Sequence, residues 1–424
     1  MPLSLRILTG LLFGVAIGAA LSFLHFGQLS AILATAGVVG TLWLNALKMT
    51  IVPLIFTLVV SSINSVSKTI SAGRLATQTL IVIGVLLIGG AILSAVVSPL
   101  LLAIWPIPTE GSHGLLNAVG ASHRAILPAQ SVADMITAMV PSNALAAASQ
   151  GDMVPFVFFT LVFGFALATL AEPSRAELTR VLGSVAETMV VIINWILRIA
   201  PLGVFALGIK LGASGSANAA GALGHYIAVT ALIGLISILS LYPLVKLRGI
   251  RMRFFAARIA PAQMVAVSTS SSLASLPAMI ESAADLGILS PIAGLVLPLA
   301  VTTFRYTSPA MNVAAGLWIA SLYGLHPNAS QIVATGAVSL VGSVAAVGLP
   351  GAINLFITYV PICAVLGLPV DVLPLLLAVD AIPDIIKTMG NVTADLALAA
   401  LMPGRSPSTA AADLLVRDSG HSAI

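Results

Sequence analysis

A run of charged and polar residues inside the last apolar segment is the feature that most restricts the fold of this chain. The stretch Asp380–Asp395, DAIPDIIKTMGNVTAD, lies near the end of an apolar run that begins close to Leu373. At about 100° per residue, six polar side chains of this stretch fall within an arc of roughly 100° on one helix face. They are Asp380, Asp384, Lys387, Thr388, Asn391 and Asp395.

Two environments can accommodate such a stripe. In a soluble protein it would be the solvated face of a surface helix. In a membrane an isolated charge costs from about 2.5 to more than 10 kcal/mol, so the stripe must face an enclosed polar cavity. The chain has 424 residues, of which 59% are hydrophobic and only 8% are charged, whereas soluble domains carry about 25% charged residues. We therefore predict a polytopic integral membrane protein in contact with the lipid bilayer.

The remaining composition excludes several other classes of protein. The net charge of +4 comes from cations in short loops beside apolar runs, which indicates membrane topology rather than nucleic-acid binding. Cys363 is the single cysteine, so no intramolecular disulfide can form. No fingerprint of a hydrolase, a nucleotide-binding enzyme or a metalloprotease stands out. We predict no enzymatic activity, no nucleic-acid partner and no cofactor other than a coupling ion, Na⁺ or H⁺.

The first part of the chain contains six apolar runs that are long enough to cross a bilayer. Placing both termini in the cytoplasm puts the basic loops after the second, fourth and sixth runs on the inside. This arrangement predicts a plasma (inner) membrane protein with a retained first span instead of a cleaved signal peptide. Residues 61–74 are interpreted as a polar connection, and 106–130 as an outer loop without a core pattern. The runs are 7–24, 41–60, 80–104, 153–170, 189–207 and 226–245.

After Arg258 the apolar pattern is interrupted. Residues 264–277, MVAVSTSSSLASLP, and 279–286 are each too short to cross about 30 Å of hydrocarbon. They predict a re-entrant helical hairpin with a serine-rich tip, because non-helical backbone at membrane depth must line a cavity or be buried. The run 291–322 is broken by FRYTSPAMN, and a second hairpin, 332–366, has the tip VGLPG. Paired interruptions of this kind are typical of substrate sites in secondary transporters.

These segments also carry a family resemblance. STSSSLASLP, FRYTSPAMN, GLPG and DAIPDIIKTMGNVTAD, in this order and spacing, resemble the glutamate transporter or dicarboxylate–amino acid:cation symporter family. LKMTIVPLIFTLVVSSI and RIAPLGVFAL are similar to it as well, so the resemblance covers nearly the whole chain, with NVTAD as its most specific motif. It implies an all-α glutamate-transporter-like fold with eight transmembrane helices and two re-entrant helical hairpins. The family's members are homotrimers in which a transport domain moves against a static scaffold.

The resemblance implies a division of the chain. Residues 1–75 would form the first two spans of the scaffold, and 76–108 the third span, which belongs to the transport domain. Residues 109–248 would hold the outer loop, scaffold spans four and five and the transport-domain span six. Residues 249–402 would form the transport core of hairpin 1, span 7, hairpin 2 and span 8. Residues 403–424 would be a disordered cytoplasmic tail.

Site residues follow from the motifs one by one. Ser271 and Ser272 match the substrate-contacting serines of the first hairpin. Asp384 matches the carboxylate that accepts the substrate's amino group, Thr388 and Asn391 match polar contacts to the amino acid's backbone, and Asp395 matches the carboxylate of a sodium site. The gating tip of the second hairpin is matched by Val347, Gly348, Pro350 and Gly351.

Two basic residues depart from the family pattern. Lys387 stands where members with acidic substrates keep an Arg, which preserves the charge but not the planar two-pronged geometry for a carboxylate. Arg305 lies in the broken seventh run, where the family usually has a small residue. Two hypotheses follow: Arg305 contacts substrate or replaces a missing cation, or it forms an internal salt bridge to Asp395 or Asp380.

The resemblance also indicates eroded cation sites. Matching the family's Asn-Met-Asp-Gly-Thr to 310–314, AMNVA, removes a carboxylate, an amide and a hydroxyl, and Leu86, Gly89 and Gly90 replace three residues with side-chain oxygens. Na⁺ needs several oxygen ligands to replace its hydration shell, so we predict that this site holds no Na⁺. Ala346 weakens a second site, whereas Asp395 and Asn391 keep part of a third for Na⁺ or a proton.

Together these features predict a secondary active, elevator-type symporter for an anionic amino acid or C4-dicarboxylate, coupled to fewer Na⁺ or to H⁺. Asp380, Asp384 and Lys387 are the groups able to carry a proton. The alternative on the same fold is an uncoupled facilitator, channel or sensor. An intramembrane enzyme that uses Asp380 and Asp384 as an acid–base pair has no nucleophile or metal set to support it.

Overall fold

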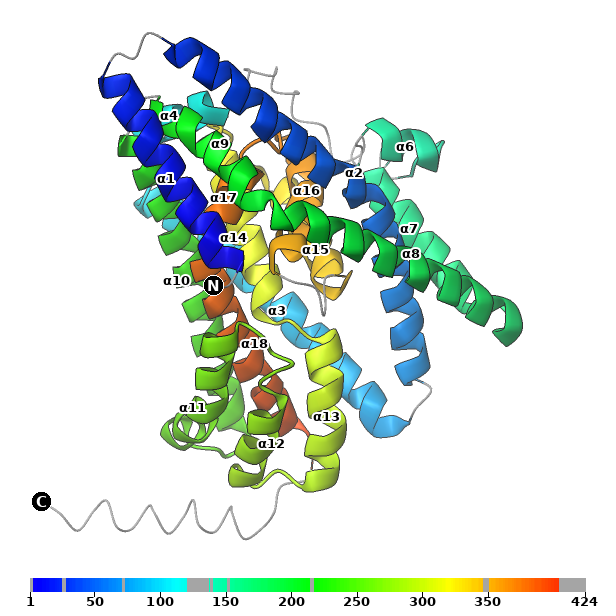
Figure 1. The fold of residues 1–424 in the computed structure, drawn as a ribbon. Helices are drawn as coiled ribbons and strands as arrows, with labels where there is room; N and C mark the ends of the chain where they lie inside the picture. Colours follow the sequence, from blue (N-terminus) through cyan, green and yellow to red (C-terminus); the bar gives the residue numbers. More distant parts are fainter. Residues whose placement is uncertain are drawn as a thin grey trace, which may run out of the picture.

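In the computed structural model of this chain, the described residues form α-helices joined by short turns and loops (Figure 1). It describes residues 3–24, 28–70, 73–119, 137, 140–150, 153–213, 217–345 and 351–403, and within these residues no strand occurs. Five of the described helices contain a stretch long and apolar enough to cross a membrane. These stretches are Arg6–Phe23, Leu29–Ala46, Arg74–Ile104, Glu172–Arg198 and Ala219–Leu247. The expected all-α membrane architecture is therefore confirmed.

The first two helices differ from each other in length. α1, Leu3–Phe23, matches the predicted first span and packs along α9, Ala200–Ala213 (Figure 1). α2, Leu29–Ile70, is one helix of 42 residues that continues through Pro53, so the prediction of a polar connection directly after residue 60 is wrong. The polar residue Asn64 is buried and donates a hydrogen bond to the carbonyl of Val60 on its own helix, so its amide nitrogen has a partner within the helix.

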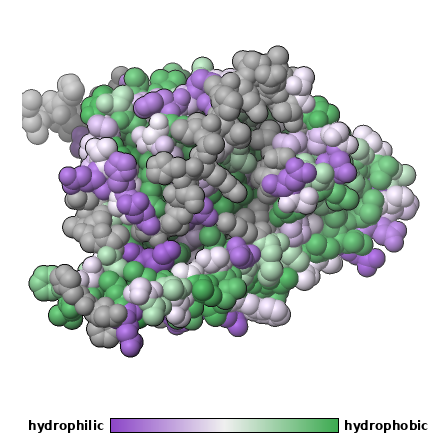
Figure 2. All heavy atoms as spheres, turned by 90° about the horizontal axis from the view of Figure 1, so that it is seen from above, coloured by the Kyte–Doolittle hydropathy of each residue, from purple (hydrophilic) through white to green (hydrophobic). Residues whose placement is uncertain are grey.

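α3, Arg74–Ile104, presents a stripe of exposed aliphatic residues along its whole length. This stripe is exposed in the structure, and we expect it to face lipid. In the view from above, many hydrophobic side chains are also visible at the surface (Figure 2). The stripe consists of Ile81, Val85, Ile88, Ile92, Val96, Leu100 and Ile104.

The region predicted as an outer loop without a core pattern contains a helix, so this part of the prediction is wrong. α4, Thr109–Val119, packs on α9 and α10, and its Leu115 is fully buried. Its apolar residues are few, but the helical repeat collects them on one face. Two further helices precede the middle of the chain, α6, Ala144–Gln150, and α7, Met153–Ala168.

The predicted fifth span is also two helices instead of one. α8, Glu172–Arg198, ends before Ile199, and α9 begins at Ala200 with Pro201 in its first turn. A proline is tolerated there because the first turn of a helix has no intrahelical partner for its N–H groups. α10, Ala217–Leu247, follows as a long continuous helix that packs on α18.

Two pairs of packed helices lie in the C-terminal half, where the sequence predicts the two re-entrant hairpins. α11, Met252–Thr269, and α12, Leu276–Asp285, pack against each other on either side of a short turn. α11 begins twelve residues before the predicted arm, so this arm is about 27 Å long at 1.5 Å per residue. The second pair is α15, Ala329–Ala345, and α16, Gly351–Val365.

Between and after the hairpins lie two interrupted helices. α13, Ser290–Thr303, stops before an extended Phe304, and α14, Thr307–Leu322, restarts with Pro309 in its first turn. α17, Leu373–Val379, and α18, Ala381–Leu401, meet at Asp380, whose backbone stays in the helical region, and Pro383 lies in the first turn of α18. α18 lies at the centre of this half, in contact with α10, α11, α13 and α14 (Figure 1).

Candidate functional site

The polar stripe of α18 is buried inside the protein. Asp380, Lys387, Thr388, Asn391 and Asp395 are all buried, and Asp384 is half-buried. The surface-helix interpretation of this stripe is therefore wrong, and the expected enclosed orientation is confirmed. Because α10, α11, α13 and α14 surround α18, the stripe is the place where most of the C-terminal helices converge.

The charges in this stripe are near one another but not closely paired. Lys387 interacts electrostatically with Asp380 and Asp384, yet within the described residues no opposite charge lies within 4.0 Å of any charged side chain of the stripe. Asp380 keeps one carboxylate oxygen, and Asp395 both, buried without a hydrogen-bond partner. A buried charge without close partners is costly, so this arrangement points to a site that acquires partners on binding.

The break between α13 and α14 is fixed to α18 by one threonine. The backbone N–H of Thr307 donates to Asn391 Oδ1 at 3.1 Å, and its hydroxyl lies 2.7 Å from both Asn391 Oδ1 and the carbonyl oxygen of Lys387. Gly390 permits this approach, because a Cβ at that position would collide with the Thr307 methyl group. Sequence reasoning missed Thr307, although its hydroxyl directly after the helix break was the available signal.

Arg305 lies at the same break, half-buried, and interacts electrostatically with Asp384 and Asp395. The structure does not contain the predicted salt bridge to Asp395 or Asp380, since no carboxylate lies within 4.0 Å of its guanidinium among the described residues. The residue is thus close enough to balance these charges without being bonded to either.

Two of the three α3 positions expected to have lost a sodium ligand are buried, and one is exposed. Leu86 and Gly90 of α3 are buried, and a Cβ on Gly90 would lie 3.2 Å from the Tyr306 ring. Tyr306 in turn places its hydroxyl 2.7 Å from that of Ser240. Gly89 is exposed and has open space beside it.

The segment 310–314 lies inside α14. Ala310 and Ala314 form a small apolar cluster with Ile233. The amide nitrogen of Asn312 donates to Ser343 at 3.4 Å, while its oxygen is buried without a partner.

The first hairpin contacts α18 through a residue that the sequence did not single out. Gln263 of α11 donates to Thr393 of α18 at 2.8 Å. Ser271 and Ser272 lie half-buried in the turn, where the Ser271 hydroxyl accepts a hydrogen bond from the backbone N–H of Ala274. Among the described residues, neither serine has a hydrogen bond to α18. Gln263 is half-buried and lies one residue before the predicted arm, so a polar side chain beside an apolar run was the available signal for this contact.

The gating tip of the second hairpin cannot be placed. Ala346, Val347, Gly348 and Pro350 lie outside the described residues, and Gly351 is the first residue of α16.

Two tyrosines extend the charged centre beyond α18. The hydroxyls of Tyr226 on α10 and Tyr359 on α16 are 3.1 Å apart, and both side chains are fully buried. Tyr359 interacts electrostatically with Lys387 and Asp380. Both tyrosines are isolated in apolar runs, so nothing in the sequence marks them.

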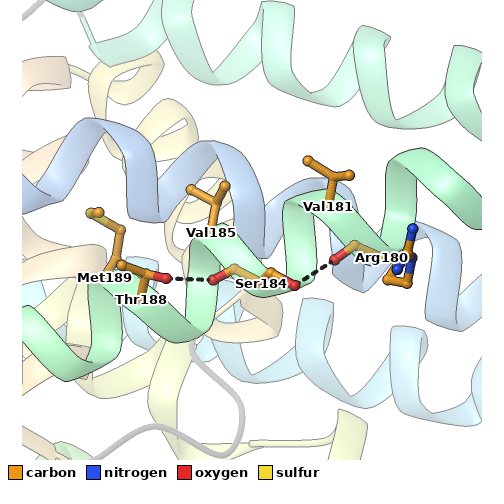
Figure 3. Close-up of a pocket in the computed structure, with 6 residues that line it drawn as sticks. All are labelled: Arg180, Val181, Ser184, Val185, Thr188 and Met189. Carbon is orange, nitrogen blue, oxygen red and sulfur yellow. Dashed lines mark hydrogen bonds between the residues drawn. The ribbon is translucent and has the colours of Figure 1, made fainter.

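A separate surface hollow lies on α8, well apart from this centre in the sequence (Figure 3). Its walls include Arg180, Ser184 and Thr188. The Ser184 hydroxyl donates a hydrogen bond to the carbonyl of Arg180, and the Thr188 hydroxyl donates one to the carbonyl of Ser184. The hollow contains none of the predicted site residues.

Comparison of the sequence with known proteins identifies the family of this chain. The sequence profile of the sodium:dicarboxylate symporter family matches residues 3–404. This chain belongs to the sodium:dicarboxylate symporter family. It is 26% identical to a proton/sodium-glutamate symport protein of Bacillus caldotenax over 408 residues, covering 94% of this chain and 93% of that protein.

Two other relatives extend the range of substrates named in this family. The proton/glutamate-aspartate symporter of Escherichia coli K12 is 26% identical over 415 residues, covering 94% of this chain and 92% of the relative. C4-dicarboxylate transport protein 2 of Bradyrhizobium sp. ORS 278 is 28% identical over 325 residues, covering 73% and 69%. As a member of the sodium:dicarboxylate symporter family, the chain is an integral membrane secondary transporter and not an enzyme.

Proposed function

We propose that this chain is an elevator-type symporter that carries an anionic amino acid or a C4-dicarboxylate, coupled to fewer Na⁺ than its relatives or to H⁺. The observation that carries the proposal is the buried stripe of α18, in which Lys387 and three carboxylates have no close ionic partner. A site with unsatisfied charges of both signs suits a solute that brings both a carboxylate and an amine.

The substrate class follows from the two ends of the stripe. Lys387 offers a compact positive charge for a carboxylate, with looser geometry than an arginine would impose. Half-buried Asp384 remains accessible to an amine, and would have to be protonated to accept a C4-dicarboxylate instead. Thr307 occupies Asn391 Oδ1, which leaves the Asn391 amide nitrogen as a donor toward substrate. Thr388, Arg305, the serines Ser271 and Ser272, and the tip at Val347, Gly348, Pro350 and Gly351 complete the proposed site.

Reduced sodium coupling is supported by what fills the expected cation positions. The Tyr306 ring lies against Gly90, and alanines at 310 and 314 pack on Ile233, so these positions offer few oxygen ligands to a cation. Asp395 with Asn391 remains as a place for one Na⁺ or a proton. Asp380, Asp384 and Lys387 are the proposed proton carriers.

The remaining architecture is proposed on family grounds. Residues 1–75 and the fourth and fifth spans would form a scaffold in a homotrimer, while 76–108, the sixth span and 249–402 would move as the transport domain. We place the protein in the plasma (inner) membrane with both termini in the cytoplasm.

The test is solute uptake by the purified protein in liposomes. L-Glutamate, L-aspartate and succinate would each be offered with a Na⁺ gradient, with a pH gradient, or with neither. We expect accumulation of at least one solute that is not cooperatively dependent on Na⁺, and loss of that accumulation in Asp384→Asn but not in the exposed control Glu281→Gln. Strictly Na⁺-dependent, cooperative uptake that ignores the pH gradient would refute the altered coupling.

An uncoupled facilitator, channel or sensor is the second candidate, favoured by the loss of oxygen ligands at the cation positions. Uptake that stops when internal and external concentrations are equal would support a facilitator or channel, because coupling is required for accumulation against a gradient. Binding without any flux would support a sensor.

A further inference from the structure

Asp395 presents a charge problem that the rest of α18 does not solve. Its side chain is 0% exposed, and both carboxylate oxygens lack a hydrogen-bond partner. A buried ionised carboxylate needs a nearby positive charge. Among the described residues, the positive side chain that interacts electrostatically with Asp395 is Arg305.

Arg305 lies within electrostatic range of more than one carboxylate of α18. Thr307, two residues further on, is hydrogen-bonded to Asn391, one helical turn before Asp395. The backbone beside Arg305 is therefore held against α18. Arg305 interacts electrostatically with both Asp384 and Asp395, which are eleven residues apart, or about 16 Å along the helix. No carboxylate among the described residues lies within 4.0 Å of it.

We propose that Arg305 is a tethered cation that balances the charge of Asp395 in place of a dissociable metal ion, with or without substrate. A guanidinium stays charged at any physiological pH and presents a fork of N–H donors that fits the two free oxygens of a carboxylate. In the loaded state a substrate amine neutralises Asp384, so Arg305 is free to pair with Asp395. In the empty state the same side chain reduces the unpaired charge of both carboxylates.

This proposal rests on the proposed transport function and explains its reduced sodium coupling. A covalently attached cation is always present at the same effective concentration, so its binding adds no dependence on external Na⁺. The neighbouring residue Tyr306 already fills the space against Gly90 with its ring. The break between α13 and α14 thus contributes an aromatic ring and a fixed charge at a place where mobile cations would otherwise be needed.

The decisive experiment removes the tethered charge and asks whether a free ion replaces it. Arg305→Met keeps an unbranched side chain without the charge, and Arg305→Lys keeps the charge. The melting temperature of each purified variant would be measured without substrate while NaCl replaces choline chloride at constant ionic strength. We expect the wild type and Arg305→Lys to be insensitive to Na⁺. Arg305→Met should be stabilised by Na⁺ with a saturable dependence, since ligand binding to the folded state raises apparent stability.

The matched control is the double variant Arg305→Met with Asp395→Asn, which removes the carboxylate as well and should lose the response to Na⁺. In Arg305→Met, saturating Na⁺ should also increase the affinity for L-aspartate, L-glutamate or succinate about tenfold, within the usual range of coupling between two sites. If Arg305→Met does not fold, Arg305→Ala would be rescued with millimolar methylguanidinium, which restores the group as a free ion.

Two results would overturn the proposal. One is a folded Arg305→Met whose melting temperature ignores Na⁺, or an Arg305→Ala variant that methylguanidinium fails to rescue. The other is a wild type that is itself stabilised by Na⁺ through Asp395, because Arg305 would then not occupy that position. Failure of the transport proposal is distinguishable, since it would appear as absent or strictly Na⁺-driven uptake by the wild type in liposomes.

Discussion

The contact between α1 and α9 and the surroundings of α18 are both buried, but they are built in opposite ways. At the α1–α9 crossing, Gly14 and Gly18 of α1 face Gly208 and Gly212 of α9, and the two backbones touch. A Cβ on Gly208 would lie 2.9 Å from the carbonyl oxygen of Leu11. Close approach of small residues is how helices associate where lipid removes the hydrophobic driving force.

Around α18 the helices are held together by polar contacts, and some polar groups have no partner. Helices meet through polar groups such as Thr307 and Gln263, and Asp380 and Asp395 keep carboxylate oxygens without partners. The α1–α9 contact therefore fixes the position of the two helices relative to each other. The α18 region instead contains carboxylates that lack hydrogen-bond partners for some of their oxygens. This difference suits a static scaffold beside a domain that binds and releases its solute.

The largest effect should come from adding bulk at the glycine crossing. In Gly212→Leu the new side chain meets the carbonyl oxygen of Val15 and the backbone nitrogen of Ala19, which cannot move without displacing α1. We expect destabilisation of about 3 kcal/mol or more, at the upper end for overpacking, seen as loss of monodisperse protein in detergent. Gly183→Leu on α8 is the control, because a Cβ there meets nothing within 4 Å. Equal yields of both variants would show that the crossing is not rigid.

A smaller loss of stability, together with a loss of substrate binding, is expected from Lys387→Met. Removing this buried charge leaves Asp380 and Asp384 without the lysine with which they interact electrostatically. We expect a loss smaller than the value of about 3–5 kcal/mol for breaking a close buried ion pair, because no carboxylate among the described residues lies within 4.0 Å of Lys387. Adding Asp380→Asn to Lys387→Met should restore much of the melting temperature without restoring substrate binding. A double variant that binds substrate as the wild type does would remove Lys387 from the site.

Thr307→Val tests the attachment of the α13–α14 break. It removes one of the hydrogen-bonding groups on Asn391 and Lys387, and leaving buried polar atoms without partners costs about 1–3 kcal/mol. Thr302→Val is the matched control, because that hydroxyl is exposed and bonds only to carbonyls of its own helix. We expect weaker substrate binding and a lower melting temperature in Thr307→Val alone. Indistinguishable variants would mean that Thr307 does not hold the break in place.

The same contrast explains what could be predicted from the sequence. The stripe of α18 is a local pattern, since its residues share a face of one helix, and this periodicity together with the low content of charged residues indicated its burial. The contacts of Thr307 with Asn391, 84 residues away, and of Gln263 with Thr393, 130 residues away, depend on how separate helices dock. No periodicity within one segment contains that information.

Errors in the helix boundaries have a local cause as well. Polar residues after position 60 indicated a connection, yet α2 continues to Ile70, and the amide nitrogen of Asn64 finds its partner in a carbonyl of the same helix. The single predicted span at 189–207 failed for the opposite reason, since Pro201 begins a new helix inside an apolar run.

The smallest effect should come from the tyrosine pair beside the charged centre. Tyr359→Phe removes a hydroxyl that lies 3.1 Å from that of Tyr226, and a single neutral hydrogen bond contributes about 0.5–1.5 kcal/mol. Tyr226→Phe should cost a similar amount, and the double variant little more than either, because both changes remove the same bond. Additive losses in melting temperature would contradict a direct interaction. If Tyr359 also orients Lys387, Tyr359→Phe should weaken substrate binding more than Tyr226→Phe does at equal stability, since of the two tyrosines Tyr359 is the one that interacts electrostatically with the lysine.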